Sequence, residues 1–137
     1  MSVGDVLKDV LIYISGILST VIVQRCSRLN NDRNDLCNQI HNVGKTAVEF
    51  WNTTGKGSSS FISGLTHELK NIDCLIMEII DRIKFMKSEL KSSIKNCNIN
   101  LRTLSTLDIE TKSECNPERS QKISDTSQEL IRLLKKI

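Results

Sequence analysis

The chain has 137 residues, of which 39% are apolar and 26% charged, and this size fits one domain with a hydrophobic core of its own. The net charge of +3 is small, and Lys and Arg are scattered among Asp and Glu, which argues against the one-sided basic surface of a nucleic-acid-binding protein. A single Pro and six Gly argue against an all-β or loop-rich chain, so we expect an all-α fold.

The first predicted helix runs from Val3 to Leu29, and its stretch from Val10 to Val23 contains no charged residue. That stretch rises about 21 Å as a helix, which is short of the ~30 Å thickness of a bilayer's hydrocarbon core. A membrane span must therefore also recruit Val6 and Leu7 and tolerate the charges of Lys8 and Asp9.

This helix is predicted to have two faces. At about 100° per residue, large apolar side chains gather on one side and small or polar residues on the other. The small residues Ser15, Gly16 and Ser19 favour a close helix–helix seam, or the lining of an assembled pore, in lipid. The predicted membrane-inserting residues are Val6, Val10, Leu11, Tyr13, Ile14, Ile17, Leu18 and Val21.

The charges that flank the apolar stretch predict an orientation. Arg25, Arg28 and Arg33 follow it, whereas Lys8 before it lies among aspartates. By the positive-inside rule, a spanning helix with this bias leaves the C-terminal part of the chain in the cytoplasm. A cleaved signal peptide is disfavoured, because the stretch has no basic start and is followed by no small-residue cleavage site.

A second helix is predicted from Asp32 to Asn52, with an apolar seam that alternates by four and three residues. Trp51 at its end is either an anchor at a bilayer surface or an aromatic at the edge of a core. Residues 53–60 (TTGKGSSS) are rich in Gly and Ser and are predicted to form a flexible connector. The expected organisation is an apolar amphipathic helix at 1–30, as a candidate membrane segment, and a helical bundle or coiled-coil region at 31–137.

The third predicted helix begins after Ser60 as N-cap and carries the most regular pattern of the chain. Extra apolar residues widen its stripe beyond a two-stranded seam, which favours a bundle of about four up-and-down helices with heptad-type packing. The pattern slips after Leu90, and the asparagines at 96, 98 and 100 predict a break there. The predicted seam is Ile62, Leu65, Leu69, Ile72, Ile76, Ile79, Ile83, Met86 and Leu90.

The last part of the chain is predicted as a short helix at 101–107, a polar loop at 108–115 and a final helix. Asn116 is a good N-cap residue for that helix, and Pro117 suits its first position. Apolar residues at helical spacing continue to Ile137, so the C-terminal residues are expected to belong to the core.

No motif predicts an enzyme or a cofactor. Gly44-Lys45-Thr46 looks like the end of a phosphate-binding loop, but Gln39 stands where the earlier glycine is required. Cys37 and His41 have the spacing of two metal ligands on one helix face, yet no second pair exists, so no metal is expected. The two histidines fall on different predicted helices, and no turn typical of a catalytic nucleophile is present.

The five cysteines are odd in number and contain no CxxC pair, which is typical of reduced, cytosol-facing thiols. Cys74 is expected to pack in the core, because a free cysteine behaves as a small hydrophobe. The tripeptide Asn52-Thr53-Thr54 matches a glycosylation acceptor, which would be used only in a secretory lumen.

Two non-enzymatic functions remain open. In the first, the helix at 3–29 inserts into a membrane, as an anchor or as a pore-forming, membrane-permeabilising effector, under the control of a cytoplasmic bundle. In the second, the chain is a cytoplasmic, soluble four-helix-bundle adaptor whose most buried element is that same helix. A membrane and a protein partner or self-association are expected in the first case, a protein partner in the second, and nucleic acid in neither.

Overall fold

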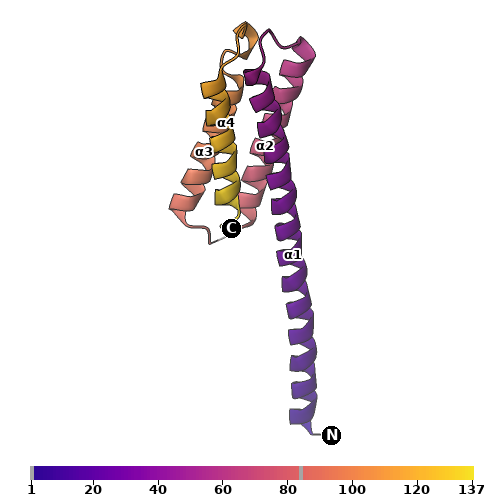
Figure 1. Cartoon of the computed structure of the whole chain (residues 1–137). Helices are drawn as coiled ribbons and strands as arrows, with labels where there is room; N and C mark the ends of the chain where they lie inside the picture. Colours follow the sequence, from indigo (N-terminus) through magenta and orange to yellow (C-terminus); the bar gives the residue numbers. More distant parts are fainter. Residues whose placement is uncertain (1, 84) are drawn as a thin grey trace. The chain divides into compact units, whose positions relative to one another are not determined.

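The computed structural model describes residues 2–83 and 85–137. The described residues form four α-helices and no strand: α1 (Val3–Asn52), α2 (Ser59–Arg82), α3 (Ser88–Thr106) and α4 (Pro117–Leu134), with a short 3-10 turn, η1 (Ile109–Thr111) (Figure 1). The helices pack against one another, which confirms the predicted all-α bundle. Contacts within the chain divide it into two compact units, one that ends at Asp32 and one that covers Arg33–Ile137.

The predicted break between the first two helices is wrong, because α1 is continuous from Val3 to Asn52. The residues at the expected break, Asn30 to Asp32, are poor helix formers, but each costs only about 0.7 kcal/mol or less relative to alanine. Gly and Pro, which interrupt helices more strongly, are missing there. Ser2 caps the helix: its hydroxyl accepts from Asp5 N at 3.2 Å and donates to the Asp5 carboxylate at 2.8 Å.

In the unit Arg33–Ile137, the second half of α1 packs antiparallel to α4. Ser120 Oγ donates to the Val48 carbonyl at 2.8 Å, and Gly44, one turn earlier in α1, lies against Ser127, two turns later in α4. A Cβ atom on Gly44 would lie 2.9 Å from both Cβ and Oγ of Ser127. The glycine that looked like part of a phosphate-binding loop therefore lies where two helix backbones approach closely.

The core of this unit combines all four helices. Leu36 and Ile40 of α1 are at most 1% exposed, which confirms the apolar seam predicted for residues 32–52. A hydrogen bond joins α3 to α2: Asn98 Nδ2 of α3 donates to Asp73 Oδ1 of α2 at 2.8 Å. The largest fully buried apolar side chains are Leu36, Ile40, Leu69, Ile72, Ile76, Ile94, Leu101, Ile123, Leu130 and Leu134.

The break predicted at residues 96–100 is also wrong, because α3 runs through all three asparagines. The chain turns earlier: α2 ends at Arg82, and residues 83–87 connect it to α3. Asn98 is only 3% exposed and binds Asp73, so it serves as a polar partner between helices and does not interrupt one. The predicted short helix at 101–107 is the last part of α3.

The ends of the other helices follow their capping residues. Ser58, not Ser60, caps α2, and its Oγ accepts from Phe61 N at 3.1 Å. Asn116 caps α4 as predicted, and its Oδ1 accepts from Arg119 N at 3.0 Å. Leu134 at the end of α4 is fully buried, so the last helix belongs to the core.

Candidate membrane-inserting segment

The first part of α1 is exposed throughout. Every described residue from Ser2 to Arg28 is exposed, and none of the most apolar 18-residue stretch of α1 is buried. By length and composition, α1 is able to cross a membrane, and it is the one helix of the described residues that meets this test. The soluble alternative requires this helix to be the most buried element of a bundle, and the burial pattern does not support that.

The eight predicted membrane-inserting residues are all accessible, with exposed fractions from 40% at Val21 to 71% at Tyr13. Ser15, Gly16 and Ser19 are exposed as well. The prediction missed further members of the apolar surface: Ile12, Ile22 and Val23 are 59 to 66% exposed. The absence of charge from Val10 to Val23 was the signal that pointed to them. A helix that is apolar nearly all round is typical of a core or of a membrane.

The exposed apolar surface has a large energetic consequence. Between Val3 and Val23 the described helix carries thirteen exposed large hydrophobic side chains. Full burial of one such side chain contributes about 1.5–3 kcal/mol, and these side chains are 40 to 78% exposed, so covering all of them contributes roughly 10–20 kcal/mol. This is comparable to the net stability of a typical domain, about 5–15 kcal/mol. Water is therefore an unfavourable solvent for this segment.

One polar side chain of the segment makes a local contact that lipid tolerates. Thr20 Oγ1 donates to the Gly16 carbonyl at 2.9 Å, which satisfies the hydroxyl within the helix. A Cβ atom on Gly16 would have no neighbour within 4 Å. The small-residue seam is thus open to a second helix.

The seam predicted for the third helix is buried in its central part and only half-buried at its two ends. Its central residues, from Leu65 to Ile79, are at most 3% exposed and hold α2 in the bundle. Ile62 is half-buried near the start of α2. Ile83 and Met86 lie in the connection after α2, and Leu90 lies in α3, so the prediction that one helix carries the whole seam is wrong.

Sequence reasoning missed a cationic cluster at the end of the bundle where α1 meets α2. Lys112 is only 5% exposed, and its Nζ donates to the Thr53 and Gly55 carbonyls at 2.6 and 2.8 Å. The same Nζ lies 4.4 Å from the centroid of the Phe50 ring. The turn predicted to be a flexible connector therefore has two of its carbonyls bound by a buried ammonium. No sequence motif distinguishes this lysine from the exposed ones.

Trp51 belongs to the same cluster and is an edge-of-core aromatic. It is 4% exposed, its Nε1 donates to the Ser105 carbonyl at 3.1 Å, and the Arg119 guanidinium lies 3.7 Å from its ring centroid. Arg119 also donates to the carbonyls of Leu104 and Leu107, near the end of α3. Burial lowers the pKa of Arg119, and the Asp108 carboxylate partly offsets this.

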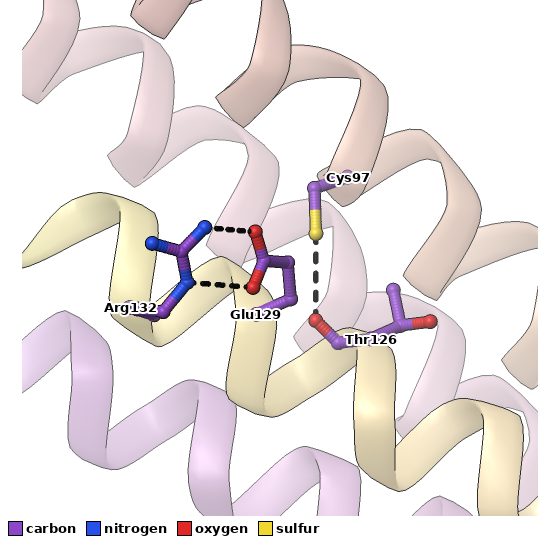
Figure 2. Close-up of polar contacts among 4 residues, drawn as sticks. All are labelled: Cys97, Thr126, Glu129 and Arg132. Atoms are coloured by element: carbon purple, nitrogen blue, oxygen red, sulfur yellow. Dashed lines mark hydrogen bonds and ion pairs between the residues drawn. The ribbon is translucent and has the colours of Figure 1, made fainter.

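Two cysteines are buried, and neither is the one that the sequence predicted. Cys74, predicted to be buried, is exposed, and the buried thiols are Cys37 and Cys97. Cys97 donates from Sγ to the Thr126 carbonyl at 3.4 Å, beside the Glu129–Arg132 ion pair (Figure 2). Burial, with a smaller contribution from Glu129, raises the pKa of Cys97 to about 11. This thiol is held in its unreactive, protonated form.

Residues with metal-binding side chains do not converge in the described part of the chain, where no group of three or more His, Cys, Asp or Glu has suitable geometry. The pair Cys37 and His41 is split, because Cys37 is buried and His41 is exposed. Comparison of the chain with protein-family models, with curated proteins and with solved structures finds no match. The exposed apolar segment of α1 is therefore the candidate functional site of the described residues.

Proposed function

We propose that this chain is a non-enzymatic membrane protein whose α1 inserts the segment from Val6 to Val23 into a bilayer, while the bundle Arg33–Ile137 lies in the cytoplasm. The observation that supports this is the complete exposure of an uncharged, apolar helical stretch. Insertion covers this surface without any change in the bundle, whose core is filled by other residues.

The length of the segment suits this role. From Val6 to Val23 the helix rises about 27 Å, close to the ~30 Å hydrocarbon thickness of a bilayer. Lys8 and Asp9 lie within the first turn of this segment, where the lysine side chain extends toward the headgroups. Gln24, Arg25 and Arg28 follow Val23, and in this orientation they lie at the cytoplasmic interface.

Within this function, the segment acts as an anchor or self-associates into a membrane-permeabilising assembly. Self-association would use the seam of Ser15, Gly16 and Ser19, which allows close approach of two helices. Replacing Gly16 and Ser19 with Leu fills the seam but keeps the segment apolar. If the segment only anchors, the variant inserts normally and no activity changes. If it assembles through the seam, crosslinked oligomers and vesicle leakage disappear while insertion is retained.

Membrane fractionation tests the proposal. The full chain is expected in the membrane fraction, and a version without residues 1–30 in the soluble fraction with the same Trp51 fluorescence. If both versions are soluble, monomeric and equally stable, the membrane function is refuted and a soluble adaptor that binds a partner protein takes its place. If removal of residues 1–30 unfolds the bundle, the helix belongs to the core instead.

The chain contains its own reporter of orientation. Asn52 of the acceptor Asn52-Thr53-Thr54 is exposed at the end of α1. On synthesis with microsomes, Asn52 should stay unglycosylated if the bundle is cytoplasmic. Residues 31–137 placed behind a cleavable signal sequence serve as the control, because their translocation delivers the same Asn52 to the lumen. Glycosylation of the full chain would contradict the proposed orientation.

A further inference from the structure

The end of the bundle where α2 turns into α3 carries the most exposed large hydrophobic side chain of the described residues. Phe85 is 96% exposed. Beside it lies a shallow hollow that Met86 and Leu90 line together with Lys87 and Lys136. We refer to these five residues, Phe85, Met86, Lys87, Leu90 and Lys136, as the connector face.

This face combines apolar and cationic groups in the way that suits a lipid headgroup layer. Lys87 and Lys136 are exposed, whereas Met86 and Leu90 are half-buried. One carboxylate, that of Glu89, lines the same hollow. An exposed phenylalanine favours the boundary between headgroups and acyl chains, and lysines favour an anionic lipid surface, to which each contributes about fivefold in binding. The charge of the face therefore complements an anionic bilayer.

The connector face also lies at the end of the bundle where α1 enters it. Because α1 and α4 are antiparallel, the end of α4 lies beside the part of α1 that begins the bundle. The charge of Lys135, just after α4, accordingly offsets part of the rise that burial causes in the pKa of Cys37 in α1. The hollow brings Leu133 and Ile137 of the C-terminal residues beside the α2–α3 connection, as the position of the C-terminus in Figure 1 also shows.

The chain itself limits how far this end can be from an inserted segment. Only residues 24–32 separate the apolar stretch from the bundle, which is about 30 Å of chain even when fully extended. The opposite end of the bundle is separated from this end by the length of α3, which is 19 residues or about 28 Å. With α1 inserted, the end of the bundle that carries the connector face is thus the end with the shorter reach of chain to the membrane.

We infer that the connector face docks on the anionic surface of the bilayer in which α1 is anchored, with Phe85 at headgroup depth and Lys87 and Lys136 against lipid phosphates and carboxylates. The inference rests on the proposed membrane function and adds a second contact to it. Docking holds the bundle against the membrane surface, so the orientation of the bundle depends on lipid charge.

Tryptophan fluorescence in the full chain tests the docking. Phe85→Trp places a probe on the connector face, and Leu107→Trp, whose parent residue is 57% exposed at the other end of α3, is the matched control. Trp51 is buried and gives both variants the same background. Each variant is reconstituted in vesicles of phosphatidylcholine, with or without phosphatidylserine, that contain lipids brominated near the headgroup.

In the vesicles with phosphatidylserine, the tryptophan emission of Phe85→Trp is expected to shift to shorter wavelength and to be quenched. The emission of Leu107→Trp is expected to show neither change. Added to Phe85→Trp, Lys87→Glu with Lys136→Glu should lower the ratio of docked to undocked bundle by about fivefold per lysine. The same charge changes at Lys45 and Lys56, which are exposed elsewhere, should leave the quenching unchanged.

Several results would overturn the inference. Quenching of Phe85→Trp no greater than that of Leu107→Trp would show that the face is not in lipid. Equal quenching without phosphatidylserine would remove the role of the lysines. A blue shift without quenching would mean that protein, such as a second copy of the chain, covers the face. Flotation of the parent chain with the vesicles is measured separately, so a failure of the membrane function itself would be recognised as such.

Discussion

Replacement of Gly44 by Ala tests the packing of α1 against α4. Alanine is the better helix former by about 1 kcal/mol, so in an open helix the change is stabilising. At Gly44, however, the new Cβ would lie 2.9 Å from both Cβ and Oγ of Ser127. Ser127 Cβ is fixed to its backbone and cannot rotate away, so the helices must separate. Overpacking of this kind costs about 1–3 kcal/mol, and a net loss of about 0–2 kcal/mol is expected.

The natural fluorescence of Trp51 gives the assay. It is the only tryptophan, it is buried in the bundle, and it therefore reports unfolding of the bundle alone. Urea unfolding of the full chain in mild detergent gives the free energy of each variant. Gly64→Ala is the matched control, because Gly64 is helical and a Cβ atom added to it would have no neighbour within 4 Å, so this change should stabilise the bundle by about 0.5–1 kcal/mol.

A double-mutant cycle separates the steric effect from helix propensity. Ser127→Gly removes both atoms that the new methyl group meets, so it should recover part of the loss caused by Gly44→Ala, with a coupling energy of about 0.5–3 kcal/mol. If Gly44→Ala stabilises the bundle as much as Gly64→Ala does, the close approach of α1 and α4 is refuted.

Two further predictions concern buried polar groups. With a pKa raised to about 11, Cys97 should react with iodoacetamide at least a hundredfold more slowly than exposed Cys74 at neutral pH, by peptide mapping; equal rates would refute the burial. Because the folded-state pKa is raised, the stability linked to Cys97 is complete at neutral pH and is lost as the pH rises toward 11, so Cys97→Ala should flatten the alkaline fall in melting temperature. Lys112→Met leaves the Thr53 and Gly55 carbonyls without their ammonium and should cost about 1–3 kcal/mol in urea unfolding, whereas the same change at exposed Lys56 should cost little; equal effects would remove the role of the cluster.

Much of the fold was predictable from short-range patterns. The seam of residues 32–52, the α4 cap at Asn116 and the all-α class follow from apolar spacing and capping chemistry, which act over one or two turns. The helix boundaries were less predictable, because heptad spacing continues across the turn after Arg82 although the helix does not. Met86 in the connector and Leu90 in α3 continue this spacing, and both are half-buried.

The errors share a physical cause, which is that tertiary contacts override local preference. Asn98 is a poor helix former, yet it stays helical because Asp73 on the neighbouring helix accepts its side-chain hydrogen bond. Lys112 looks like any surface lysine, and only the folded turn places two carbonyls and an aromatic ring around it. Cys74 lies in an apolar helix but on its outer side, which the composition of the helix does not reveal.

The apolar segment was recognisable from sequence because lipid insertion depends on local hydrophobicity and length. What sequence left open was whether a core covers it, and the burial pattern answers this for the bundle: residues from Leu36 onward fill that core by themselves.

Two arginines placed in the apolar segment test most directly whether α1 is a membrane-inserted helix. Ile14→Arg with Ile17→Arg should oppose insertion by about 6 kcal/mol or more. The control is Ile99→Arg with Leu107→Arg in the bundle. These two residues are 59% and 57% exposed, similar to the 46% of Ile14 and the 48% of Ile17.

The measurement is extraction of cellular membranes with alkaline carbonate, followed by Trp51 emission of the purified variants. Our account predicts that the parent chain and the bundle control stay in the membrane pellet, while the Ile14 and Ile17 variant moves to the supernatant with unchanged Trp51 emission. A parent chain that is extracted by carbonate, or a segment variant that stays in the pellet, would contradict the claim that α1 is a membrane-inserted helix.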